Sequence, residues 1–353
     1  MPRAIVGMAA DKLRGGQNRA GRIAWKQAWR VPTGVTALAI FVSRRFLQAV
    51  PTLLGLTVVS FLLVHIVPGG PAQAMLGPKA TPLRVAAIDR EFGLNRPLYV
   101  QYYEWVVQLI HGNLGVSYFY NLTVTQLFLI TLPRTLAIVA TSIVFSHVGA
   151  ILLGCIQAYW RDSWFDHVTT SVLYFFYSMP TFWLAIVVLI IFSLDLNLFP
   201  PGGITDPTGL QNFWDWAAHV TLPVFTLVIA TMAGWTRFMR TTMVDTLVQD
   251  YVRTARAKGL SEFMVVFKHA LRNALLPLVT LFGYNIPALF SGALFIEVVF
   301  NYPGMGLLLY NSAIKRDYPV IMAGVLVTGV LVVAGNLIAD ILYAVVDPRI
   351  RYD

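Results

Sequence analysis

The sequence predicts an all-α, polytopic membrane protein with six transmembrane helices. Hydrophobic residues make up 57% of the 353-residue chain and charged residues only 12%, with a mean hydropathy of +0.66. Soluble domains are about one-quarter charged, so this composition favours the membrane class. Stretches free of Asp, Glu, Lys and Arg recur along the chain, and each reaches the ~20 residues that cross a ~30 Å hydrocarbon layer. Backbone inside a bilayer must be hydrogen-bonded internally, which favours helices.

The predicted elements follow in chain order. Residues 1–45 are basic and are expected to form a cytoplasmic extension, and 46–67 the first transmembrane helix, ending before PGGP. Residues 68–133 are predicted to form an extracytoplasmic segment with two amphipathic helices, in TPLRVAAIDREFGL and YVQYYEWVVQLIHGNLG. Residues 134–346 are expected to form a core of five transmembrane helices, and 347–353 a cytoplasmic tail. The charge-free runs that predict the five helices are 135–160, 167–194, 216–236, 273–296 and 318–339.

The distribution of Lys and Arg predicts the orientation. Nineteen lie in the two termini and in the segments 159–167 and 237–272, against six in the alternate loops. The positive-inside rule therefore places both termini in the cytoplasm of a multi-pass protein of the plasma or inner membrane. The net charge of +9 is explained by topology and gives no reason to expect a nucleic-acid partner.

Several classes of chemistry lack their motifs in this sequence. We find no G-x-S-x-G, H-E-x-x-H or C-x-x-C pattern, so no catalytic or metal-binding residue is predicted. No P-loop pattern occurs, so the chain is not expected to bind ATP itself. The six histidines are dispersed, and the mid-span His147 is expected to be a packing residue rather than a ligand or proton carrier. Glu297 and Asp340 lie near span ends, which weighs against a proton-coupled carrier.

One polar block interrupts the apolar core. Residues 250–277, DYVRTARAKGLSEFMVVFKHALRNALLP, carry seven formal charges between two predicted spans. Gly259 is expected to stop a first helix and Ser261 to cap a second, with Glu262 in its first turn. The second helix then places Phe263, Val266, Phe267 and Ala270 on one face, by their spacing of three and four residues. Such a face fits either the bilayer surface or a groove on a cytoplasmic partner, and the residues alone do not separate the two.

The block resembles the cytoplasmic loop of ABC-importer permeases, in the form found in the dipeptide/oligopeptide/nickel branch. That form is similar to YVRTARAKGL followed by HALRNALLP. The general motif of these permeases is Glu-Ala-Ala, three residues, Gly, nine residues, a hydrophobic residue, one more residue, Leu and Pro. Ala255 and Gly259 match it, Arg253 and Thr254 replace the Glu and the first Ala, and Leu271 is followed by Arg rather than Pro. The Leu-Pro pair appears later, as Leu276-Pro277.

Other stretches resemble the same branch in the same order, over residues 38–353. They are RRFLQAVPTLLGLTVVSFLLVHIVPGGP, FGLNRPLYVQYYEW with HGNLGVSY, FNYPGMGLLL with RDYPVI, and the C-terminal DPRIRY.

The resemblance implies a type I ABC importer permease fold and a transport function. It implies that this chain and a second, homologous permease subunit form a heterodimeric pathway. Two ATP-binding subunits would use ATP and Mg²⁺, an extracytoplasmic binding protein would deliver di- or oligopeptides, and this chain would bind no cofactor. Residues 245–277 would be the coupling loop to the ATPases. The residues assigned to coupling are Ala255, Gly259, Ser261, Phe263, Val266, Phe267, Ala270, Leu271, Leu276 and Pro277.

The sequence leaves the translocation path and the substrate open. Asn285 and Ser291 are candidate residues of the translocation path because they are polar groups in the fifth predicted span. The substrate alternatives are nickel, a metallophore or another small solute. A secondary carrier is the alternative from a different class, and it would work without ATP.

Overall fold

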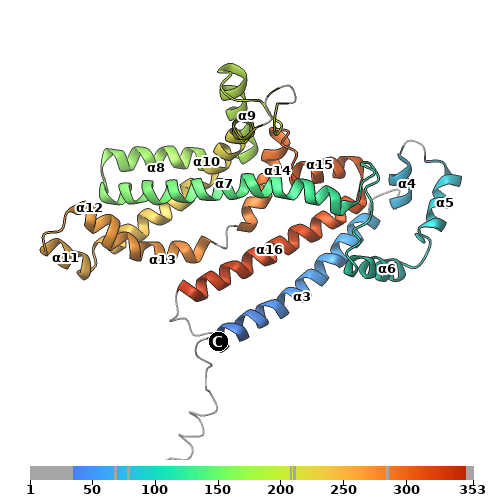
Figure 1. The fold of residues 1–353 in the computed structure, drawn as a ribbon, viewed down its shortest axis with the longest axis horizontal. Coiled ribbons are helices and arrows are strands. Elements are labelled where there is room, and N and C mark those ends of the chain that lie inside the picture. Colours follow the sequence, from blue (N-terminus) through green and yellow to red (C-terminus); the bar gives the residue numbers. More distant parts are fainter. Residues whose placement is uncertain are drawn as a thin grey trace, which may run out of the picture. The chain divides into compact units, whose positions relative to one another are not determined.

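The computed structural model describes residues 35–66, 70–77, 80–206, 209, 212–282 and 286–346, and these form a helical protein (Figure 1). The first helices are α3 (Val35–Ile66), α4 (Gly70–Leu76), α5 (Pro82–Glu91), α6 (Leu98–Ile110) and α7 (Val124–Tyr159). Next come α8 (Trp164–Tyr177), α9 (Thr181–Leu189), the π-helix η2 (Ile190–Asp195) and α10 (Phe213–Leu247). The rest are α11 (Asp250–Ala257), α12 (Glu262–Met264), the π-helix η3 (Val265–Ala270), α13 (Leu271–Phe282), α14 (Ile286–Val299), α15 (Met305–Lys315) and α16 (Tyr318–Val346).

The described residues contain four helices that are long and apolar enough to cross a membrane, within α3, α7, α10 and α16. A fifth results if α8 and the α9–η2 segment count as one span bent by 101°. The bend falls at Ser178–Pro180, where Pro180 precedes the first residue of α9 and supplies no N–H to continue α8. The predicted span 273–296 is divided between α13 and α14. The count of six spans is compatible with this arrangement and stays a prediction.

The first helix begins earlier than the sequence pattern indicated. We expected it from Phe46, but α3 begins at Val35. Arg44 and Arg45 are good helix formers, so the two charges before the apolar run do not end the helix. The predicted extension before Val35 and the predicted tail 347–353 lie outside the described residues.

The centre of the compact unit Gln48–Arg349 is the pair α7 and α10. The two helices approach closely at Gly154, where an added Cβ would lie 2.8 Å from Met239 Cβ and 3.0 Å from the Arg240 backbone nitrogen. Such a close approach requires a residue without a side chain, and small residues often allow it in membrane helix bundles. The pairing fixes the end of α10 from which the predicted coupling loop continues.

The segment between α3 and α7 contains both helices predicted for it. Thr81 caps α5, and α6 packs on the end of α3: the rings of Tyr102 and Trp105 lie 5.4 and 6.0 Å from that of Phe61. The Tyr102 hydroxyl lies 2.8 Å from Thr57 Oγ1. By contrast, Tyr99 is 75% exposed. One side of α6 therefore packs against α3, and the other side is exposed at the surface.

Buried Asp317 fastens the end of this segment to the start of α16. Its carboxylate accepts hydrogen bonds from the Ser117 hydroxyl and from the Tyr118 backbone N–H, the latter at 3.1 Å. Burial, and then the negative charge of Asp317, raise the pKa of the Tyr118 phenol to about 12. The loop that precedes α7 is therefore held by a carboxylate about 200 residues away in sequence.

Candidate functional site

The backbone of the predicted coupling loop has the helix–break–helix form that the sequence indicated. Helix α11 ends at Ala257, and Gly259 has φ +79°, a left-handed conformation that ends helices and suits glycine. Ser261 then accepts a hydrogen bond from the Met264 N–H at 3.4 Å and caps α12, with Glu262 in the first turn. The predicted conformations of Gly259 and Ser261 are confirmed.

An ion pair closes the turn around Gly259. The Arg256 guanidinium donates to the Glu262 carboxylate at 2.8 and 3.3 Å. Both side chains are close to half exposed, at 41% and 44%, so the pair contributes about 1 kcal/mol or less to stability. Its effect is geometric, because it holds the end of α11 against the start of α12.

The predicted apolar face is divided by its packing. Val266 and Ala270 are buried, at 2% and 0% exposure, together with Val252, Ala255 and Val265. These side chains pack against α7 and α10 of the same chain, through Cys155, Met239 and Met243 among others. Residues 265–270 form a π-helix, so the α-helical spacing that predicted one common face does not hold there. Val266 and Ala270 therefore anchor the loop to its own bundle instead of facing a partner.

The aromatic side chains of the block remain accessible. Phe263 is 71% exposed, and the partly buried Phe267 stacks on it with ring centroids 4.7 Å apart. The two rings border an apolar groove of about 440 Å³ that is completed by Cys155, Tyr159 and Trp160 of the α7 end and by other neighbours. Among the predicted coupling residues, Phe263 and Phe267 thus offer accessible apolar side chains that another protein could contact directly.

The remaining predicted residues belong to α13, to α14 or to the part of the chain between them. Leu271 starts α13 and is partly buried against the same apolar cluster. Leu276 and Pro277 lie in α13 and Ser291 in α14, with their side chains outside the described set. Asn285 lies outside the described residues. The assignment of Asn285 and Ser291 to the translocation path stays a prediction.

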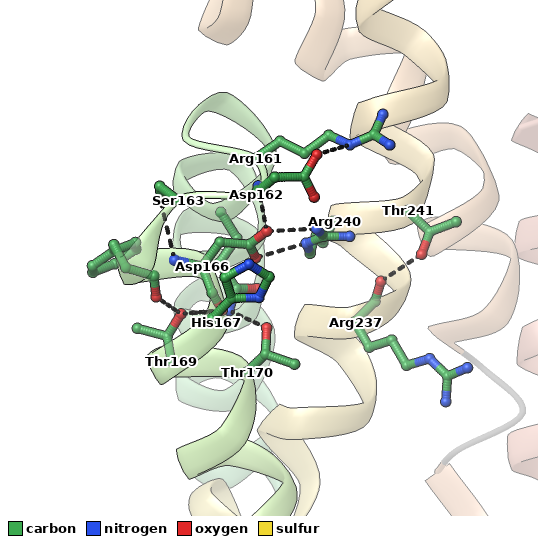
Figure 2. A network of polar contacts seen from close by, with 12 residues as sticks. Arg161, Asp162, Ser163, Asp166, His167, Thr169, Thr170, Arg237, Arg240 and Thr241 are labelled. Carbon is green, nitrogen blue, oxygen red and sulfur yellow. Dashed lines mark hydrogen bonds and ion pairs between the residues drawn. The ribbon is translucent and has the colours of Figure 1, made fainter.

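A polar network that the sequence analysis did not single out holds α8 to α10 at the loop end of the bundle (Figure 2). The Asp166 carboxylate accepts from Arg240 Nε at 2.8 Å and Nη2 at 2.5 Å, and from the Asp162 N–H at 3.0 Å. The Asp166 side chain is only 2% exposed. The sequence signal was available: Ser163 caps α8, which puts Asp166 in the first turn of the helix.

A second carboxylate stabilises the opposite end of the core. Glu297, on α14, is fully buried and accepts from the Thr135 hydroxyl at 2.5 Å and from the Leu307 N–H at 3.0 Å. Leu307 lies in the first turn of α15, whose unpaired N–H groups favour a carboxylate. An added Cβ at Gly304 would collide with this carboxylate, which explains the glycine. Glu297 is therefore an internal cap for α15.

His147 is a packing residue in the structure. Its Nδ1 lies 2.8 Å from the Ile143 carbonyl oxygen, and its ring stacks on Trp235 with centroids 4.3 Å apart. Among the described residues, no group of three or more His, Cys, Asp or Glu side chains could hold a metal ion.

The family models matched by the chain cover most of its length. Residues 150–352 match the model described as "Binding-protein-dependent transport system inner membrane component", and residues 38–139 match the N-terminal model of such components. The oligopeptide transport system permease protein AppB of Bacillus subtilis (strain 168) is 42% identical over 89% of this chain and 100% of its own length. The dipeptide transport system permease protein DppB of Alkalihalophilus pseudofirmus is 35% identical over 88% of this chain and 99% of its own.

The fold has a solved counterpart. A chain of the MetNI methionine ABC transporter, in an inward-facing conformation, superposes with a TM-score of 0.53 at 16% identity, over 63% of this chain and 97% of that one. The likeness concerns the fold alone. The matches to both family models, and to full-length relatives above 30% identity, show the family. The chain belongs to the binding-protein-dependent transport system inner membrane components, the permease subunits of ABC importers.

Proposed function

We propose that this permease forms half of the translocation pathway of an ATP-driven importer of di- and oligopeptides. The observation that carries the proposal is the match to AppB and DppB, whose names state oligopeptide and dipeptide transport, over almost their entire lengths. The match includes the loop and the extracytoplasmic segment, two of the regions that resemble this branch in sequence.

The proposed assembly has a second, homologous permease subunit, two ATP-binding subunits and an extracytoplasmic binding protein. The ATP-binding subunits use ATP and Mg²⁺, and this chain binds no cofactor. Both termini lie in the cytoplasm, as the Lys and Arg distribution favours.

The loop 245–277 has the mechanical features that coupling requires. Phe263 and Phe267 are accessible, while Val266 and Ala270 anchor the same helix to α7 and α10. When the ATP-binding subunits close on ATP, their own surface groove, which holds Phe263 and Phe267, displaces the loop. Because the loop is packed on the bundle, the displacement reaches the spans as a rigid-body movement that alternates access to the pathway.

Nickel, a metallophore or another small solute is the alternative cargo within this family. The arrangement of His147 against Trp235 gives no support to a metal route through that residue. A secondary carrier is the alternative from another class, and dependence on ATP separates it from the proposal.

The test is transport by the complete importer in proteoliposomes, with ATP or a non-hydrolysable analogue inside. We expect uptake of labelled di- to oligopeptides that requires hydrolysable ATP and the binding protein, and no uptake of nickel. Uptake of nickel but not of peptides would overturn the cargo. Uptake that survives the analogue would overturn the ATP-driven class.

Orientation is tested separately, in a variant whose single cysteine, Cys155, is replaced by Ser. A cysteine introduced at Thr208 should react with an impermeant maleimide on intact cells, and one introduced at Ser261 only after permeabilisation. The opposite pattern would reverse the proposed topology.

A further inference from the structure

A polar pocket of about 310 Å³ lies beside the Asp166–Arg240 pair, between α8 and α10. Its polar lining comes from Asp166 together with Gln157, His167, Thr170, Ser171, Tyr174, Arg237, Arg240 and Thr241. Neither the coupling loop nor the family resemblance accounts for it. Its donors and charges indicate the kind of ligand that it would recognise.

The pocket offers hydrogen-bond donors and a positive charge. Among the described residues that line it, Asp166 is the sole carboxylate, is almost completely buried and is already bound to Arg240 through two oxygens. Arg237 extends away from that pair (Figure 2) and is exposed, with its guanidinium 6.0 Å from the Tyr174 ring centroid. Within the described part of the chain, no carboxylate forms an ion pair with Arg237. The charges of Arg237, Arg240 and Asp166 sum to +1, so the pocket favours an anion.

A hydroxyl group adds a donor of suitable geometry. Thr170 Oγ1 accepts a hydrogen bond from Gln157 Nε2 at 3.3 Å, and its own proton has no acceptor among the described residues. Arg240 uses Nε and Nη2 for Asp166, which leaves further N–H groups. A tetrahedral oxyanion with several acceptor oxygens matches such a set, and arginine binds phosphate oxygens well.

The position of the pocket identifies the source of the oxyanion. The charge-free run of α10 ends at Thr236, directly before Arg237. At the same end of the bundle, α7 finishes and α8 begins with the exposed aromatic residues Tyr159, Trp160 and Trp164. Exposed Trp and Tyr residues concentrate at the level of lipid headgroups, and basic pockets between membrane helices bind anionic headgroups there.

We propose that this pocket binds the phosphate of an anionic phospholipid headgroup, with Arg237 as its main charged contact. The lipid would bridge α8 and α10 beside the buried ion pair, at the end of the bundle that carries the loop. The proposal requires only that the chain spans a membrane, so it is independent of the transported substrate.

Native mass spectrometry of the full-length chain in detergent tests the proposal, with phosphatidylglycerol and zwitterionic phosphatidylcholine as probes. We expect wild-type protein to prefer phosphatidylglycerol, and Arg237→Gln to weaken its binding about fivefold, the effect of about one basic residue near a lipid surface. Arg237→Lys keeps the charge and should retain most of the preference. The matched control is Arg161→Gln, at the same end of the bundle but outside the pocket, where Arg161 pairs with Asp162 at 3.2 Å.

Three results would overturn the proposal. Unchanged phosphatidylglycerol binding in Arg237→Gln would remove the site. An equal loss in Arg161→Gln would indicate general surface charge. Displacement of phosphatidylglycerol by equimolar inorganic phosphate, or by a labelled peptide, would assign the pocket to a free anion or to the substrate. Because Arg237 is exposed, its variants should unfold like the wild type, which circular dichroism would check.

Discussion

Breaking the Asp166–Arg240 pair from its two sides should have very different effects on stability. In Arg240→Met, the Asp166 carboxylate loses two charge-assisted hydrogen bonds and keeps the Asp162 N–H at 3.0 Å, in a site where its side chain is 2% exposed. Leaving a buried charge without its partner costs about 3–5 kcal/mol. In Asp166→Asn, the amide oxygen can still accept from Asp162, and Arg240 is 28% exposed and reaches water, so we expect about 1–2 kcal/mol.

The double variant separates this reasoning from a simple sum of two defects. With both partners neutral, the buried charge is gone. The unfolding free energy that the double variant loses should therefore be smaller, by at least about 2 kcal/mol, than the sum of the losses in the two single variants. The assay is unfolding of the purified chain in mixed micelles of rising SDS fraction. The control is Arg256→Gln, which breaks the half-exposed pair with Glu262, also made through two nitrogens of the guanidinium, and should cost about 1 kcal/mol or less. Additive losses, or a control as damaging as Arg240→Met, would refute the argument.

Three further outcomes are expected. Gly259 has φ +79°, and a Cβ added there would meet no neighbouring atom within 4 Å, so a substitution acts through backbone strain alone. Gly259→Val should cost about 1–2 kcal/mol and reduce ATP-driven uptake, whereas Gly259→Asn should largely preserve that uptake. Equal uptake in the two variants would contradict this. Phe263→Asp should leave the chain folded but reduce co-purification of the ATP-binding subunits, whereas Val266→Asp, which buries a carboxylate, should lower the yield of folded protein; the reverse order would contradict the assigned roles. The pKa of Tyr118 is raised from 10.0 to about 12, so the folded state loses stability as pH rises from 10 towards 12 and not below; unfolding midpoints at about pH 9 and about pH 11 should therefore differ less in Tyr118→Phe than in wild type.

Local signals predicted much of the architecture. Charge-free runs marked the long helices, and the residues Gly259 and Ser261 marked a helix stop and a helix start where the structure has them. These features depend on neighbours along the chain, through backbone conformation and capping hydrogen bonds. The same holds for Thr81, which caps α5 in the outer segment.

The features that the sequence did not predict depend on contacts between distant segments. A helical spacing cannot tell whether an apolar face meets a partner or the chain's own bundle, and the π-helix moved Val266 and Ala270 into contact with α7 and α10. The role of Glu297 as an internal cap requires knowing that the first turn of α15 returns to the end of α14. Likewise, Asp166 resembles an ordinary first-turn acid until Arg240 is found beside it.

The continuity of α12, η3 and α13 has a mechanical consequence. These segments run from Glu262 to Phe282 without a gap, which at about 1.5 Å per residue makes a lever of about 30 Å. On the other side of Ser261 the chain passes through Gly259, a joint outside regular helix. A force applied at Phe263 therefore travels stiffly into α13, and the packing of Val266 and Ala270 transmits it sideways to α7 and α10 as well. One rigid segment thus passes a single displacement to three helices of the bundle.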